Sequence, residues 1–176
     1  MKLAEIKKLL DTNGYTFTET VVSSRSDFYR EKGFKPSKDS GAFILLSIIN
    51  PNHAKNIELI FGDDSSNPDF YDLEFGGFWY ELFGCSDEEL PEFLLGEIQT
   101  IVQGNAYIIF AMDGKNGRWF SDSIYYDLPD EEMNCMDEFH DALSKIHSPK
   151  GLWRKLIGRT DIYEIFNWTS YEKITK

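Results

Sequence analysis

Short runs of apolar and aromatic residues with the period of a β-strand follow one another along this chain, and few helical segments separate them. Alternation over Tyr15–Val22 and the apolar runs Phe43–Ile49 and Ile57–Phe61 predict the first strands. Later strands are expected at Tyr71–Phe75, Phe78–Phe83, Ala106–Met112, Arg118–Tyr126 and Ile162–Trp168. Adjacent strand runs with few helices between them favour antiparallel pairing. The pattern therefore predicts an α+β fold, a mostly antiparallel sheet with helices packed on it.

Three helices are predicted from apolar spacing and end signals. The first has Leu3, Ile6, Leu9 and Leu10 on one face and ends at Asn13-Gly14. The second follows the capping box Ser86 to Glu89 and buries the stripe Leu94, Leu95, Ile98, Ile101 and Val102. The third is expected from Pro129 to about Ile146, with Met133 and Met136 among its core residues. These helices supply the layer that covers the sheet.

The connections carry recognisable turn chemistry. Asp113–Gly117 contains Asp-Gly and Asn-Gly steps, which tolerate positive φ and indicate a hairpin. The pair Gly76-Gly77 interrupts a strand pattern and is expected to form a bulge or bend. The polar stretch from Ser23 to Ser40 is expected to be a long loop or a frayed hairpin.

Length and composition indicate one globular domain, residues 1–176, in the cytoplasm. A chain of 176 residues with 15% aromatic residues can bury a real core. Charges interrupt the first ten residues, so they do not read as a signal peptide, and the apolar run Gly41–Ile49 is too short to cross a bilayer. Cys85 and Cys135 are expected to be reduced thiols, although a bridge between them stays open.

Negative charge is concentrated in the middle of the chain. Between Glu58 and Asp141 there are 21 acidic side chains against two basic ones, Lys115 and Arg118, whereas the whole chain has a net charge of −12. Such a field attracts basic partners and repels nucleic acid and anionic membrane. A surface that is only solubilising usually mixes both signs. The segment therefore predicts binding of a basic protein partner, with neither nucleic acid nor membrane as a partner.

The predicted partner-binding residues are acidic clusters and two aromatic anchors among them. The strand region Phe70–Phe83 should place aromatics on one face and carboxylates on the other, and Tyr and Trp are favoured interface anchors. The simpler alternatives are a core strand with a solvated acidic face and, for acids at helix starts, favourable interaction with the helix dipole. The predicted set is Asp63, Asp64, Asp69, Tyr71, Asp72, Glu74, Trp79, Glu81, Asp87, Glu88, Glu89, Asp130, Glu131 and Glu132.

The sequence shows no pattern of catalytic or metal-binding residues, so we expect no enzyme activity, no metal site and no cofactor. A calcium loop that began at Asp63 would need glycine where Pro68 stands, so the match is partial. His140 and His147 lie seven residues apart, too far for a zinc pair on one helix. No phosphate-binding loop or nucleophile motif occurs. The basic stretch Lys150–Arg159 is expected to serve an intramolecular role beside the acidic face.

In size, in net charge and in its mixture of aromatic and acidic residues, the chain resembles the immunity proteins of bacterial polymorphic toxin systems. The segments that carry the resemblance are Phe70–Phe83 and Tyr163–Trp168, with their mixed aromatic and acidic residues. The resemblance implies binding to a cognate toxin by occlusion, in which carboxylates pair with the toxin's Arg and Lys while aromatics fill its cleft. Two other classes stay open: a nucleic-acid mimic that inhibits a DNA-binding enzyme, and a small enzyme with a carboxylate-rich active site.

Overall fold

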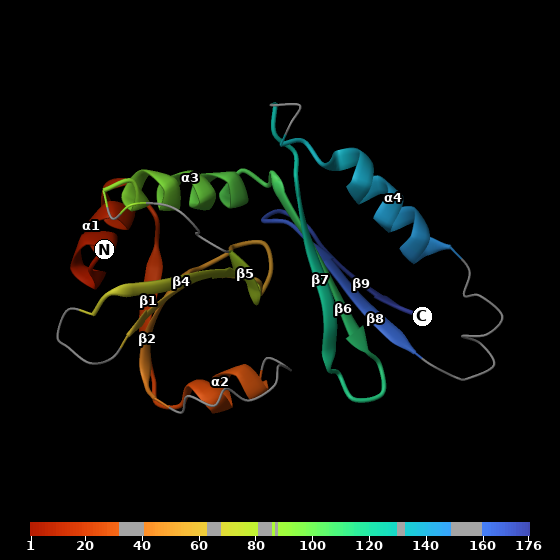
Figure 1. The fold of residues 1–176 in the computed structure, drawn as a ribbon, viewed down its shortest axis with the longest axis horizontal. Helices are drawn as coiled ribbons and strands as arrows, with labels where there is room; N and C mark the ends of the chain where they lie inside the picture. The colour runs from red at the N-terminus through yellow and green to blue at the C-terminus, as the bar shows by residue number, and fades with distance from the viewer. Residues whose placement is uncertain (32–40, 63–67, 81–85, 87, 130–132, 149–159) are drawn as a thin grey trace. The chain divides into compact units, whose positions relative to one another are not determined.

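The computed structural model describes residues 1–31, 41–62, 68–80, 86, 88–129, 133–148 and 160–176. Within these ranges the chain forms four helices and nine strands, in the order α1, β1, α2, β2, β3, β4, β5, α3, β6, β7, α4, β8, β9 (Figure 1). The strands pair into two antiparallel sheets, one of five strands and one of four. The chain therefore has the α+β class that the sequence predicts, with two sheets where one was expected.

The chain separates into two compact units, Met1–Gln99 and Thr100–Lys176, and each contains one sheet. The boundary falls inside helix α3 (Leu90–Val102). Compactness does not by itself determine whether a unit folds alone, so the single domain expected from the sequence stays a prediction. None of the helices in the described part of the chain is both long and apolar enough to cross a membrane.

The five-stranded sheet is a meander, because each strand pairs with the next one along the chain. Its strands are β1 (Phe17–Val22), β2 (Phe43–Ile48), β3 (Ile57–Gly62), β4 (Phe70–Phe75) and β5 (Phe78–Tyr80). Gly76 and Gly77 join β4 to β5 with φ values of 59° and 98°, and Phe75 stands opposite Phe78. Positive φ at both positions is the geometry of a two-residue hairpin. The glycine pair is thus a hairpin turn between two strands: of the bulge or bend that the sequence predicted, the bulge was wrong and the bend is this turn.

Helices cover both faces of this sheet. Leu46, Leu59 and Leu73 face one another across β2, β3 and β4, and all three are fully buried. Figure 1 shows α1 (Leu3–Thr12) and α3 on one side of the sheet and α2 (Arg25–Glu31) on the other. On the α2 side the ring of Phe28 meets that of Phe43 edge to face, 5.1 Å between centroids. Helix α2 lies within Ser23–Ser40, so the loop or hairpin predicted there was wrong for these seven residues.

The second sheet has the order β7-β6-β8-β9. Its strands are β6 (Ala106–Asp113), β7 (Trp119–Tyr126), β8 (Asp161–Phe166) and β9 (Tyr171–Thr175). The predicted Asp113–Gly117 hairpin is confirmed, since the Gly117 N–H donates to the carbonyl of Asp113 at 2.8 Å. Strand β9 was not predicted.

Helix α4 (Met136–His147) packs on one face of the second sheet, where Phe139 and Ile146 join Ile109 and Ile165 in a buried cluster. The helix begins seven residues later than the predicted start at Pro129, and the acidic residues that were expected in its first turn, 130–132, lie outside the described residues. Met136 packs against the cluster, as predicted, but Met133 is half exposed and is not a core residue.

Candidate functional site

Five of the predicted partner-binding residues lie wholly or partly at the surface, and we call them the acidic surface. Four of them are exposed and one, Asp72, is half-buried; the set is Asp69, Tyr71, Asp72, Glu88 and Glu89. They come from two places in the Met1–Gln99 unit, the beginning of β4 and the residues just before α3. From residue 58 to residue 99 the chain has twelve carboxylates and no Lys or Arg. The acidic surface therefore belongs to a stretch without a single basic side chain.

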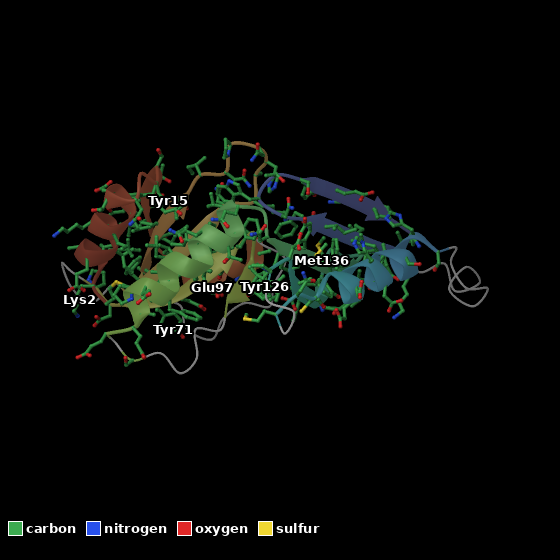
Figure 2. All side chains as sticks on the ribbon, turned by 90° about the horizontal axis from the view of Figure 1, so that it is seen from above. Lys2, Tyr15, Tyr71, Glu97, Tyr126 and Met136 are labelled. Atoms are coloured by element: carbon green, nitrogen blue, oxygen red, sulfur yellow. The ribbon has the colours of Figure 1, made fainter. Side chains whose placement is uncertain are left out.

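The exposure of Tyr71 follows from a β-bulge. Ile60 stands opposite Asp72 and Phe61 opposite Phe70, so Tyr71 is the extra residue between the two pairs. A bulge re-aims a side chain relative to regular strand alternation, and the side chain of Tyr71 is 65% exposed. In Figure 2, Tyr71 lies at the margin of its unit, on the side opposite Tyr15. A large aromatic group is thus presented to solvent between two aspartates.

The first residues of the chain hold the start of β4 in place. The Phe70 N–H donates to the carbonyl of Met1 at 2.8 Å, and the Leu3 N–H donates to the carbonyl of Pro68 at 2.9 Å. Lys2 Nζ donates to Asp69 Oδ2 at 2.6 Å, and this hydrogen bond is the main reason that the pKa of Asp69 is lowered. Asp69 is therefore ionised at neutral pH, but Lys2 already partly satisfies its charge.

The residues just before α3 form part of the predicted capping box. The N–H and the Oγ–H of Ser86 both donate to Glu89 Oε2, at 3.1 and 2.8 Å. The Leu90 N–H donates to the carbonyl of Ser86 at 3.0 Å, which starts the helix. The two hydrogen bonds from Ser86 lower the pKa of Glu89, the side-chain bond most. Glu88 and Glu89 are both exposed, so their charges are available to a partner.

One pocket is lined both by Asp69 of the acidic surface and by the first turn of α3. Asp69 at the start of β4 and Pro91 in the first turn of α3 both line a cavity of about 590 Å³. The other lining residues are Met1, Lys2, Glu5, Lys8, Leu9 and Thr12, all from α1 and the two residues before it. Asp69 and Pro91, which follows Glu89 by two residues, therefore line the same pocket.

Glu74 does not belong to this surface. Its side chain is completely buried, although the sequence placed it on a partner-binding face. The register sets Glu74 directly opposite the half-buried Glu58, and Asp72 lies two residues along the same face of β4. The predicted alternation in β4 is confirmed for Leu73 and Phe75 on one face against Asp72 and Glu74 on the other. The acidic face, however, is not freely solvated, because Glu74 is buried opposite the half-buried Glu58 inside the unit.

The remaining predicted site residues lie outside the described part of the structure. Trp79 belongs to β5, but its side chain is not described. The others are Asp63, Asp64, Glu81, Asp87, Asp130, Glu131 and Glu132. The basic stretch Lys150–Arg159 and Cys85 also lie outside, whereas Cys135 is a half-buried free thiol. Of the predicted acidic clusters, the structure therefore describes only the one around Asp69 and the one just before α3.

Sequence reasoning missed the pocket. Glu5, Lys8, Leu9 and Thr12 have the spacing i, i+3, i+4, i+7, which puts them on one stripe of α1. Leu9 was assigned to the core face, but the core residues of α1 are Leu3, Ile6 and Leu10. The adjacent pair Leu9-Leu10 could have revealed this. Neighbouring residues on a helix point about 100° apart, so only one of the two can lie at the centre of the core face.

Within the described residues, no group of three or more His, Cys, Asp or Glu side chains is placed to hold a metal ion. Comparison with protein-family models, with curated proteins and with solved structures finds no match to this chain. The geometry of the acidic surface and its pocket is therefore the basis for a functional proposal.

Proposed function

We propose that this chain is a small acidic cytoplasmic protein that neutralises a basic protein partner, as an immunity protein that blocks a cognate bacterial toxin by occlusion. The observation that carries the proposal is the exposed Tyr71, set by a bulge between Asp69 and Asp72 in a stretch of twelve carboxylates without a basic residue. An exposed aromatic side chain next to carboxylates is a combination that can anchor and orient a basic protein partner.

The two kinds of residue have different roles in this proposal. Glu88 and Glu89 accelerate encounter with a basic surface, because exposed charges act mainly on the association rate. Tyr71 slows dissociation, because a large aromatic side chain that becomes buried at an interface costs about 2 kcal/mol or more when it is truncated. Asp69 contributes less than its exposure implies, since a partner must compete with Lys2 for it.

The test is co-expression with the polypeptides that are encoded beside this chain's gene. We expect one of them to be basic and to stop growth of a bacterial host, and this chain to restore growth and to form a purifiable complex with it. The double variant Glu88→Lys/Glu89→Lys should weaken protection. The control Asp137→Lys/Glu138→Lys makes the same charge change in the first turn of α4, in the other unit, and should protect fully. Equal protection by both variants would contradict the proposed surface.

A second candidate function, a small enzyme with a carboxylate-rich site, draws support from one observation. Glu58 and Glu74 face each other across β3 and β4 with Glu74 buried, and Asp72 is on the same face. Two carboxylates in unequal environments are a common arrangement for general acid and base catalysis. A screen for turnover, repeated with Glu74→Gln, distinguishes this candidate from a pure binding protein.

A further inference from the structure

The pocket beside the acidic surface has a different character from that surface. We call it the α1 pocket and define it by its lining residues Met1, Lys2, Glu5, Lys8, Leu9, Thr12, Asp69 and Pro91. Its two lysine and two carboxylate side chains balance, and the α-amino group of Met1 adds one positive charge beside Asp69. Lys2 is already paired with Asp69, and its backbone N–H donates to Glu5 Oε2 at 2.7 Å. The apolar groups are Met1, Leu9, Pro91 and the stem of Lys8.

The surroundings of the α1 pocket are acidic. Glu88 and Glu89 precede Pro91 and Glu92 follows it, and all three are exposed. A largely apolar hollow, whose lysine and carboxylate side chains balance and whose margin is acidic, complements an apolar group that carries positive charges around it. A volume of about 590 Å³ is within the range of roughly 300–1,000 Å³ that receives ligands in proteins.

We propose that the α1 pocket receives a large apolar side chain of the partner, one flanked by basic side chains in the partner's own sequence. The inference rests on the proposed function, since it takes the partner to be a basic protein. It adds the position on this chain where that protein is bound. The apolar side chain would rest on Leu9 and Pro91. The flanking Lys or Arg residues would meet Glu88, Glu89 and Glu92, and Tyr71 would contact the partner beside the pocket.

The probes are three labelled pentapeptides, each with a central residue between two charged residues on either side. They are a tryptophan between lysines, an alanine between lysines, and a tryptophan between glutamates. Binding is measured by fluorescence anisotropy. We expect the first peptide to bind at least about ten-fold more tightly than the second, because burying a large apolar side chain is worth one to two factors of ten in affinity. We expect the third to bind most weakly.

Thr12→Phe places a ring in the α1 pocket from an exposed position at the end of α1 and should abolish the preference for tryptophan. Ala4→Phe is the matched control, because Ala4 is an exposed position of the same helix that does not line the pocket, and the preference should persist. Thermal unfolding of both variants verifies that α1 still folds.

The possible outcomes separate this inference from the proposed function. A tryptophan preference that survives Thr12→Phe, or equal affinity of the two lysine peptides, overturns the pocket assignment and leaves the acidic surface standing. Tighter binding of the glutamate-flanked peptide overturns both, because it indicates an anionic partner. No binding of any peptide at millimolar concentration overturns the pocket assignment only, since co-expression tests the proposed function independently.

Discussion

Glu97 on α3 provides a prediction about stability with a definite sign. Its side chain is half-buried, and its Oε2 is buried without a hydrogen-bond partner among the described residues. Burial raises the pKa of Glu97 above the ordinary value of 4.5. Taking a carboxylate charge partly out of water disfavours the ionised form, and solvent screening at a half-exposed site limits this cost to about 0.5–1 kcal/mol. Glu97→Gln keeps the shape and removes the charge, so it should stabilise the fold at pH 7 by about that amount.

The pH dependence of this gain is fixed by the direction of the pKa shift. A raised pKa means that the folded state holds the Glu97 proton more tightly than the unfolded state does. In the wild-type protein the contribution of Glu97 to stability is therefore fully present below pH 4.5, and it is lost as the pH rises through the folded-state pKa. The advantage of Glu97→Gln should be largest at pH 7 and should disappear towards pH 4.

Thermal unfolding followed by circular dichroism at pH 7 and pH 4 measures both effects. For a chain of this length a gain of about 0.5–1 kcal/mol raises Tm by about 1–4 °C. Glu92→Gln removes an exposed charge from the first turn of the same helix and should leave stability unchanged or slightly lower it. A lower Tm for Glu97→Gln at pH 7, or an undiminished gain at pH 4, would refute the reasoning.

Three further predictions concern single residues. Tyr71→Ala should leave Tm nearly unchanged, because the side chain is 65% exposed, whereas Phe75→Ala should cost about 3–5 kcal/mol, because that ring is fully buried; urea unfolding distinguishes the two. Gly96→Ala should stabilise by about 1 kcal/mol, since a helical Cβ meets nothing within 4 Å, whereas Gly114→Ala should destabilise, since its Cβ would lie 2.7 Å from Thr160; paired thermal melts decide this. The isolated protein should show no hydrolase or transferase turnover, with or without divalent metals, and reproducible turnover that Glu74→Gln abolishes would instead favour the enzyme candidate.

Elements with local signals were predictable from the sequence. Examples are the turn Asp113–Gly117 and the capping interaction of Ser86 with Glu89. Both partners of each of these interactions lie within four positions of each other, so a short sequence pattern is enough to predict them. The same holds for the end of α1, where Gly14 has a φ of 75°. The α+β class followed from the order of such elements.

The missed elements depend on partners distant in sequence. Helix α2 has seven mostly polar residues and is placed by the contact of Phe28 with Phe43, fifteen positions away. Strand β9 has five residues, with Glu172 and Lys173 in the middle, and its pairing with β8 depends on the turn at Asn167. There Asn167 Oδ1 accepts hydrogen bonds from the backbone and side chains of Thr169 and Ser170. No periodicity over five residues predicts such a pairing.

The exposure of some candidate site residues was predictable from the sequence, whereas their role in binding stays a prediction. Composition indicated an acidic surface with aromatic anchors, and Tyr71, Glu88 and Glu89 are exposed as that requires. The sequence could not reveal that Glu74 is buried. Its burial depends on the register in which β3 pairs with β4 and on what covers the face of the sheet that carries Glu74. Nor could it reveal the α1 pocket, which forms where α1, β4 and α3 meet.

The salt dependence of association tests the central claim most directly. The partner identified by co-expression is mixed with this chain in stopped flow at ionic strengths from about 0.05 to 0.3 M, over which the Debye length falls from about 14 to 6 Å. We predict that the association rate falls steeply as salt rises. We also predict that Glu88→Lys/Glu89→Lys slows association and flattens this dependence, whereas Asp137→Lys/Glu138→Lys changes it little. An association rate that is independent of salt, or equally affected by both double variants, would contradict binding through the acidic surface.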